Sequence, residues 1–275
     1  NYLQLSQYKY DVAMRDFLYK DYQRAGDFLN RRLLIEGNKL KIFQSLDKNV
    51  SRYFSDRRAK QILEYAMVFL GTSPRDAPGL YSILAHVDLN LGVYYPSGGL
   101  AGVARGFRKH AESLGVEVIT GADVSKIATQ NGKAVAVESS AGSFDADVVV
   151  SGADYAHTEI DLLDQDARSF GESYWKKKVF APSMFIMFLG INKRLDNLEH
   201  HNLYFSEDWD RHFDTIFKTP SWPEEPCFYV SCISKTDADA APAGSENVFV
   251  LVPVAPGLGD TDEVRQMYYE KTLDH

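Results

Sequence analysis

The chain has 275 residues, 45% of them hydrophobic, so it can bury a sizeable core in one large or two ordinary domains. Its formal net charge of −8 argues against a nucleic-acid partner, since binding to nucleic acid requires a basic face. The two cysteines, Cys227 and Cys232, are too few for a disulfide scaffold or a zinc site and indicate a reducing, cytoplasmic setting.

The first part of the chain has the pattern of helices. Apolar residues recur at helical spacing in three segments, residues 27–36, 43–54 and 55–70. Ser55 is the expected N-cap of the third helix and Gly71 its end. The second half of this helix is apolar almost all round, which fits either ordinary core or the wall of a tunnel for a long hydrocarbon. Residues 2–24 are rich in tyrosine and basic side chains, which fits either a helix with one core face or contact with a membrane interface.

A more varied pattern follows. Three short apolar segments have the composition of strands, residues 92–95, 116–119 and 147–151. Between the first two, apolar residues at helical spacing predict a helix that ends at Gly115. Asn131 and Gly132 separate two alternating segments and form the strongest short-range signal for a β-hairpin. This part of the chain therefore predicts the order strand, helix, strand, hairpin, strand.

The glycines before the predicted helix raise the question of a dinucleotide site. Gly98, Gly99 and Gly102 are spaced GGxxG rather than GxGxxG. Glu117 falls near the place of a ribose-binding acid but lies between two core valines of its own segment. Glycines at such a turn also serve positive φ angles or close packing. The motif is weak as a complete phosphate site.

The last part of the chain alternates strands and helices. Four apolar segments predict strands, residues 183–189, 202–205, 227–233 and 248–254. Short helices are expected near residues 170–178 and 209–218. The longest apolar run, residues 181–191, is too short to span a bilayer. The whole chain therefore predicts a mixed α/β fold whose last part holds a mixed or antiparallel sheet.

Metal and hydrolase sites have little support. His200 and His201 are adjacent, so on a strand they are expected to point to opposite faces and not to share a metal. A calcium loop that begins at Asp237 would need glutamate at its twelfth position, where Val248 stands, and a polar turn is expected instead. No GxSxG sequence occurs, so a nucleophilic serine elbow is not indicated.

Several segments follow one another in an order that is typical of one family. These segments are PSGGLAGVARGFRKHAESLGVEVITGADVSKI, DADVVVSGADYAHTEIDLL, APSMFIMFLGINKRL, LEHHNLYF and ENVFVLVPVAPGL. Together they resemble the bacterial-type phytoene desaturases, which are carotenoid desaturases of the flavin amine oxidase superfamily. Members of that family open with a GxGxxG unit for FAD and close with a second glycine-rich motif, and neither occurs here. The chain begins at Asn1 and ends within an apparent helix, so we expect an internal fragment.

The resemblance implies a division into domains and a flavin site. Residues 1–87 and 156–275 would be two parts of a substrate domain, with a partial FAD-binding domain, residues 88–155, between them. The main chain of Val124 would meet the adenine end of FAD, with Ala153 and Asp154 close by, while Gly98 and Gly99 would approach the isoalloxazine ring. Because both flavin motifs are absent, we expect this chain not to retain FAD, although the full-length protein would.

The resemblance also implies an activity, the FAD-dependent desaturation of a phytoene-type polyene. Hydride would leave an allylic carbon for the flavin and a neighbouring proton would be lost, so the protein must orient the polyene and exclude water. Asp88 and Glu64 are among the possible proton acceptors, and the sequence does not choose between them. A flavin-dependent carotenoid isomerase and a non-catalytic prenyl-lipid carrier of the same fold stay open as alternatives. A substrate dissolved in lipid implies peripheral association with the inner face of the membrane.

Four side chains are candidates to border the polyene. Methionine and aromatic side chains adapt well to an unbranched apolar ligand. We therefore expect Phe69, Tyr94, Met187 and Phe188 to line the passage. Strand alternation would turn only one of the last two inward. Ordinary core packing is the alternative for all four.

Overall fold

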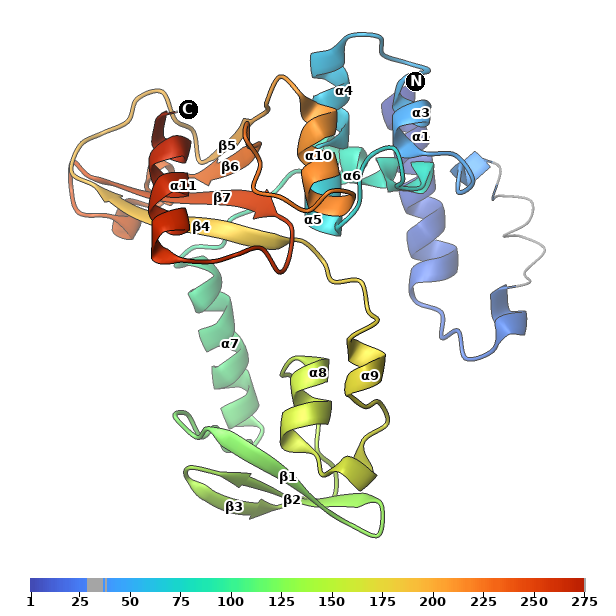
Figure 1. The fold of residues 1–275 in the computed structure, drawn as a ribbon, viewed down its shortest axis with the longest axis vertical. Coiled ribbons are helices and arrows are strands. Elements are labelled where there is room, and N and C mark those ends of the chain that lie inside the picture. Colours follow the sequence, from blue (N-terminus) through green and yellow to red (C-terminus); the bar gives the residue numbers. More distant parts are fainter. Residues whose placement is uncertain (29–36, 38, 275) are drawn as a thin grey trace. The chain divides into compact units, whose positions relative to one another are not determined.

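The computed structural model describes residues 1–28, 37 and 39–274. The chain forms two compact units, one made of residues 1–98 and 181–275 and the other of residues 99–180 (Figure 1). The second unit is thus inserted into the first. The sequence placed the corresponding boundaries at residues 87/88 and 155/156, and the assignment of the units to a substrate domain and a flavin domain stays a prediction.

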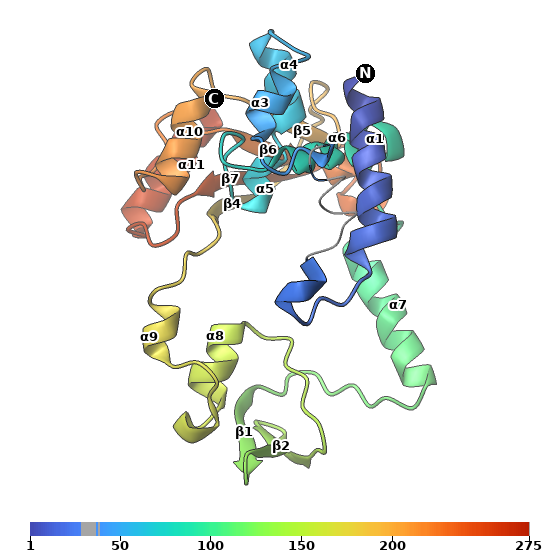
Figure 2. The same ribbon diagram turned by 90° about the vertical axis from the view of Figure 1, so that its right-hand side faces the viewer.

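The first unit begins with helices that pack around one apolar core. Figure 2 shows α1 beside α6, and Tyr2 from α1 lies in the core with Val50, Met67 and Trp209. The helices of this group are α1 (Tyr2–Val12), α3 (Leu46–Val50), α4 (Arg57–Glu64), α5 (Met67–Leu70), α6 (Ile83–His86) and α10 (Trp209–Phe217). Shorter turns join them, namely π-helices at Ala13–Leu18 and Val87–Leu91 and 3₁₀ helices at Ala25–Phe28 and Gly79–Ser82.

Helix α1 buries one face, as the first of the two readings of residues 2–24 expected. Tyr2, Ser6, Lys9 and Val12 are buried, and the Lys9 ammonium donates to the Gly79 carbonyl at 2.6 Å and to the Ser82 hydroxyl at 2.7 Å. A buried ammonium needs such acceptors, because an unpaired charge in the core is strongly destabilising. Burial lowers the pKa of Lys9 to about 8. The basic residue at the centre of this helix is therefore part of the core.

The predicted helices differ from the observed ones in their limits. The predicted single helix over residues 55–70 is two helices, α4 and α5, and Asp56 replaces Ser55 as N-cap because its carboxylate accepts from the amides of Arg58 and Ala59. Gly71 ends α5 with φ of 76°, as predicted. Helix α3 covers only the centre of the segment expected at 43–54. The helix expected at 27–36 lies mostly outside the described residues.

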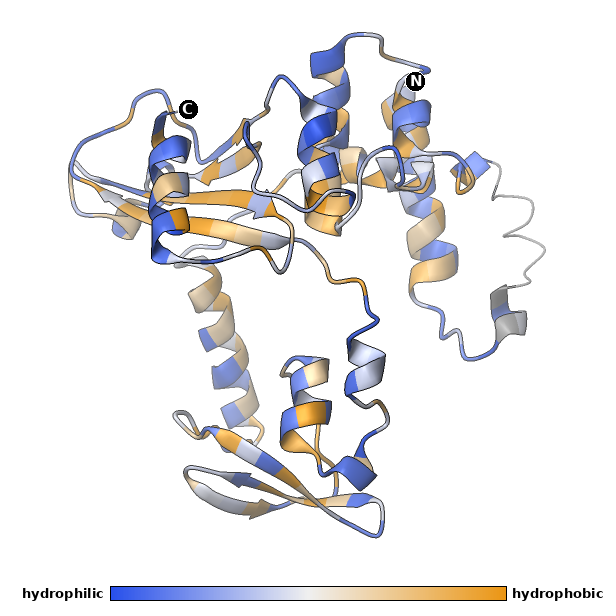
Figure 3. Ribbon diagram, in the orientation of Figure 1, coloured by the Kyte–Doolittle hydropathy of each residue, from blue (hydrophilic) through white to orange (hydrophobic). Residues whose placement is uncertain are grey.

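A four-stranded antiparallel sheet completes the first unit. Its strands are β4 (Ser183–Ile191), β5 (His201–Tyr204), β6 (Phe228–Ser231) and β7 (Glu246–Val254), in the order β4-β7-β6-β5. The four predicted strands are confirmed, and both cysteines flank β6, where they are buried and free. Val250 and Val252 of β7 pack with Tyr268 of α11 (Asp262–Asp274), so one face of the sheet is core. Figure 3 shows that β4 and β7 are largely hydrophobic.

The second unit contains one long helix and a small sheet. Helix α7 (Gly99–Ser113) precedes three antiparallel strands, β1 (Val124–Gln130), β2 (Lys133–Ser139) and β3 (Gly142–Asp145). The predicted hairpin is confirmed, since Asn131 and Gly132 both have positive φ, at 53° and 74°, as a type I′ turn requires. The short helices α8 (Tyr155–His157) and α9 (Glu172–Trp175) follow, with a π-helix at Thr158–Leu162.

Three predicted strands are wrong. Residues 92–95, 116–119 and 147–151 are not assigned to strands and carry no strand pairing. Their apolar side chains are mostly exposed, and Val150 reaches 90% exposure. An apolar segment becomes a strand only when a neighbour takes up its backbone hydrogen bonds, and no described residues pair with these three. Composition alone therefore predicted more strands than the chain forms, one of them in the first unit and two in the second.

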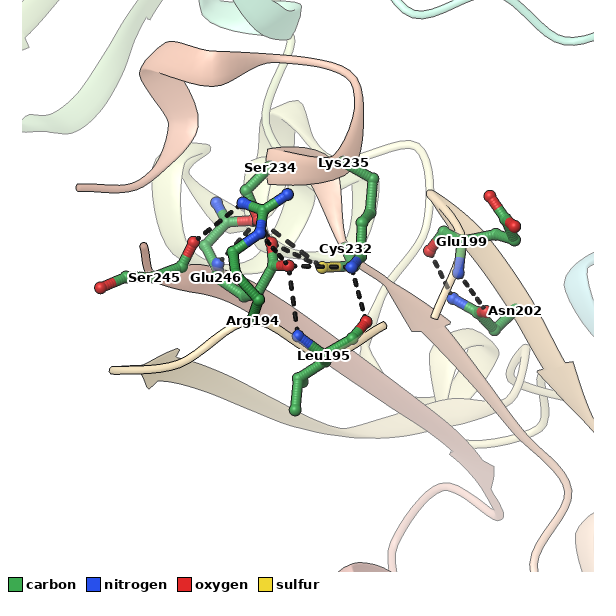
Figure 4. A network of polar contacts seen from close by, with 10 residues as sticks. Arg194, Leu195, Glu199, Asn202, Cys232, Ser234, Lys235, Ser245 and Glu246 are labelled. Carbon is green, nitrogen blue, oxygen red and sulfur yellow. Dashed lines mark hydrogen bonds and ion pairs between the residues drawn. The ribbon is translucent and has the colours of Figure 1, made fainter. Parts of the chain in front are cut away.

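The buried carboxylate of Glu246 holds together chain segments at one end of the large sheet. Glu246, the first residue of β7, has a side chain with no exposed surface and accepts from the Ser234 hydroxyl, from Lys235 at 2.9 Å and from Arg194 at 3.2 Å (Figure 4). The hydrogen bonds from Ser234 and Lys235 lower the pKa of Glu246 to about 2. The ionised carboxylate thus joins the residues after β6 and after β4 to the start of β7.

We predict that the substitution Glu246→Gln removes part of the acid sensitivity of folding. The carboxyl has a pKa near 4.3 when unfolded and about 2 when folded, so its stabilisation is complete above pH 4.3 and is lost as the pH falls through 2. Urea titrations should therefore show the variant less stable than wild type at pH 7, with a gap that narrows toward pH 2. Glu112→Gln, in an exposed pair with Arg108, is the control and should leave the stability unchanged both at pH 7 and near pH 2. An equal deficit at all pH values would contradict the assignment.

Candidate functional site

The large sheet has a second face that is apolar and open. Cross-strand partners share a face, so the register of the pairs places one row of side chains, Ile186, Leu251, Tyr229 and Leu203, across all four strands. Phe188 and Phe249 belong to the next row, with ring centroids 5.3 Å apart. We call these six residues the open sheet face. Phe188, on the edge strand β4, is 82% exposed.

A cavity lies where the open sheet face meets α5. It is a partly open hollow with a volume of about 20 Å³ and is lined by Tyr65, Val68, Phe69, Leu203, Tyr204, Phe205, Trp209, Cys227, Phe228, Tyr229, Leu251 and Pro253. Three of these residues, Leu203, Tyr229 and Leu251, also belong to the open sheet face. Nearly all lining side chains are apolar or aromatic, as is typical of a site for an apolar ligand. The cavity and the face therefore form one continuous apolar surface within the first unit.

Two tyrosines of the cavity wall carry polar contacts. The Tyr65 hydroxyl donates to the Asp88 carboxylate at 2.5 Å, and the Tyr229 hydroxyl lies 2.6 Å from Nδ1 of His201. Burial, and then the bond to Asp88, raise the pKa of Tyr65 well above its ordinary value. Desolvation and the neighbouring His200 lower the pKa of His201. Each phenol thus brings an ionisable partner to an otherwise apolar wall.

The histidine pair does not have the predicted geometry. His200 and His201 were expected to point to opposite faces, but their rings stack at a centroid distance of 4.2 Å. The reason is that β5 begins at His201, so His200 precedes the strand and does not follow its alternation. His200 instead contacts the Thr236 hydroxyl through Nδ1 at 2.6 Å. Within the described residues, no group of three or more ligating side chains suits a metal ion.

The structure distinguishes between Asp88 and Glu64, the two possible proton acceptors between which the sequence could not choose. Asp88 reaches the cavity wall through its bond to Tyr65. Glu64 is buried in the helical part, is not among the lining residues, and one of its carboxyl oxygens lacks a hydrogen-bond partner among the described residues. Burial and the nearby Asp47 raise the pKa of Glu64 to about 7. Only Asp88 is therefore coupled to the cavity.

The four predicted substrate-lining residues fall in different places. Phe69 lines the cavity, and Phe188 lies on the open sheet face. Met187 is only 5% exposed and packs in the core on the opposite face, because successive residues of a strand alternate. Tyr94 is 86% exposed and is not among the lining residues of the cavity. A substrate role for any of the four stays a prediction.

The five predicted flavin residues lie outside the cavity. Gly98 and Gly99 have φ of 74° and 69° at the start of α7, so bare backbone is presented there. Val124 begins β1, and Ala153 is exposed. Asp154 caps α8 by accepting from the His157 amide at 3.0 Å. These contacts do not assemble a flavin site by themselves, and both the site and the retention of FAD stay predictions.

Sequence reasoning missed the residues that build the cavity on the sheet side. Tyr229 and Leu251 are ordinary members of apolar strands, and nothing in their local sequence marks them. Alternation within β7 separates Leu251 from Val250 and Val252, but only the register with β6 brings Leu251 to Tyr229. That register joins residues that lie far apart in the sequence, so the local sequence does not predict it.

The sequence of the chain is similar to those of known proteins. A family model described as "Flavin containing amine oxidoreductase" matches residues 7–241. A carotenoid 3,4-desaturase from Haloarcula japonica is 43% identical over 99% of this chain and 55% of its own length. A zeta-carotene-forming phytoene desaturase from Myxococcus xanthus is 31% identical over 92% of this chain and 49% of its own length. The chain thus spans about half the length of these relatives.

A solved structure supports the fold. An oxidoreductase from Methanosarcina mazei aligns with a TM-score of 0.55 and 19% identity, over 91% of this chain and 56% of its own. At this identity the similarity concerns the fold alone.

We predict that the substitution Phe69→Trp weakens the binding of an apolar polyene about tenfold, because the larger ring fills the cavity. Trp209 also lines the cavity, so quenching of its fluorescence by the polyene reports binding. Tyr94→Trp is the matched control: it adds the same ring outside the lining and should leave binding unchanged. Equal loss in both variants would show that the cavity is not where the polyene binds.

Proposed function

The chain belongs to the flavin-containing amine oxidoreductase family, and within it we propose that the full-length protein is an FAD-dependent desaturase of a long phytoene-type polyene. The observation that carries the proposal is the apolar cavity that continues along the open sheet face. A polyene has no charged or strongly polar group, so it is recognised by apolar contact along its length, which this surface supplies. The identity to proteins named carotenoid and phytoene desaturases points in the same direction.

The protein's own contribution is orientation, exclusion of water and proton transfer. FAD, when bound, supplies the acceptor for the hydride that leaves an allylic carbon. The cavity wall would hold the polyene and keep water from the reacting carbons. The neighbouring carbon must lose a proton, and Tyr65 with Asp88 is the pair that reaches the wall: the phenol oxygen would take the proton while its own passes to the carboxylate.

We further propose peripheral association with the inner face of the membrane. The substrate of a carotenoid desaturase dissolves in lipid, so an enzyme at the surface can collect it there. None of the helices in the described part of the chain has the length and apolar composition needed to cross a bilayer.

We predict that the full-length protein, supplied with FAD and an electron acceptor, converts a phytoene-type polyene to a product that absorbs at longer wavelength. Each added double bond extends the conjugated system, so absorbance and chromatography with authentic standards measure the reaction. Formation of geometrical isomers alone would instead support a carotenoid isomerase. Binding without any product would support a prenyl-lipid carrier.

We predict that the substitution Asp88→Asn lowers turnover about a hundredfold, because the amide cannot accept the proton that Tyr65 passes on. Polyene binding, followed by the quenching of tryptophan fluorescence, should be unchanged. Glu64→Gln makes the same carboxyl-to-amide change away from the cavity and should keep most of the activity. Full activity in Asp88→Asn would exclude this pair as the proton acceptor.

A further inference from the structure

The end of the inserted unit carries a short segment of unusual composition. Residues 174–180, with the sequence YWKKKVF, begin with the last two residues of α9 and belong entirely to the unit of residues 99–180. We call them the basic-aromatic segment. Lys176, Lys177 and Lys178 are exposed, and they are followed by Val179 at 98% exposure and Phe180 at 66%. Three cations thus stand next to two apolar side chains that are mostly exposed.

The charge of the segment contrasts with that of the chain. The sequence has 38 acidic and 30 basic residues, so a run of three lysines is a local exception. Lys176 pairs with Glu172 at 3.3 Å, but both side chains are exposed and such a pair is weak. Lys178 lies over the Tyr174 ring at 3.9 Å. Within the described residues, neither Lys177 nor Lys178 forms an ion pair, so most of the positive charge is available to an anionic surface.

Aromatic packing holds the segment on its unit. Tyr174 stacks on Phe170 at 4.1 Å, and Trp175 meets Tyr174 at 5.0 Å and Tyr155 at 5.1 Å. These contacts give the segment a fixed base, although α9 has only four residues. The lysines and the apolar pair are therefore presented together by the inserted unit.

We propose that the basic-aromatic segment is where the protein contacts the surface of an anionic membrane. Tyrosine and tryptophan favour the interface of a bilayer, lysines next to them attract anionic head groups, and exposed apolar side chains enter the acyl boundary. A protein partner fits less well, because lysine is depleted in protein interfaces. The inference rests on the membrane association proposed above and gives it a location.

The segment differs from the first candidate in the sequence, part of which is buried. Residues 2–24 also combine tyrosine with basic side chains, but Tyr2 and Lys9 of that stretch are in the core of the first unit. The buried ammonium of Lys9 is held by Gly79 and Ser82 and cannot meet a lipid head group. The basic-aromatic segment keeps its three lysines at the surface.

The test is sedimentation of the full-length protein with vesicles of phosphatidylcholine alone or of equal parts phosphatidylcholine and phosphatidylserine. Wild type should bind the anionic vesicles more tightly, and added salt should weaken that binding. The variant K176Q/K177Q/K178Q should bind them about a hundredfold more weakly, at about fivefold for each lysine. The variant V179S/F180S should lose about tenfold on anionic vesicles.

A matched control changes the same charge elsewhere. R52Q/R57Q/R58Q neutralises three exposed cations of the first unit and should bind as wild type does. If wild type binds neither vesicle, the membrane association itself fails. Suppose that wild type binds anionic vesicles. If the lysine variant then binds equally well, or if the control loses as much affinity as the lysine variant, the basic-aromatic segment is not the membrane contact. Circular dichroism and flavin content of each variant should match wild type, and only variants that pass are compared.

Discussion

The register between β4 and β7 is the constraint on which the candidate site depends. Nine residues of β4 pair with nine of β7 without a shift. Because side chains alternate along each strand, this register places Met187, Val250 and Val252 in the core and puts Phe188, Phe249 and Leu251 together on the opposite face. A slip of one residue would exchange the two faces, so the same pairing that builds the core also builds the open sheet face.

The buried Glu246 stabilises this register at the start of β7. Its carboxylate gathers Ser234, Lys235 and Arg194, which come from segments that follow β6 and β4. A buried charge is tolerated only when its partners are in place, so the strands that these segments follow are held relative to β7. Specific polar contacts thus position a surface whose own side chains are almost all apolar.

Local signals predicted those elements whose stability is local. The Asn131-Gly132 turn needs only two residues with positive φ, and Gly71 needs only one, so both could be located from sequence. The apolar segments at 116–119 and 147–151 looked equally clear, but a strand depends on a neighbour that composition does not reveal. The stacked rings of His200 and His201 show the same limit, since the first residue of β5 decides whether alternation applies to both. Helix α4 begins one residue later than predicted, because the carboxylate of Asp56 accepts from the amides of Arg58 and Ala59.

Only part of the candidate site could be predicted from the sequence, for a related reason. Alternation required that Met187 and Phe188 face opposite ways, yet it could not say which one faces the core, because either face of an apolar strand can be buried. The helices decide this: Tyr268 of α11 covers the face of Met187, while the other face borders the cavity, which Phe69 of α5 and Trp209 of α10 also line. Covering an aromatic side chain such as Phe188 is worth about 1.5–3 kcal/mol, and a monomeric protein rarely leaves several such side chains exposed side by side without a use for them. Under the proposed function, an extended apolar ligand would cover this face, and Tyr65 with Asp88 would accept the proton.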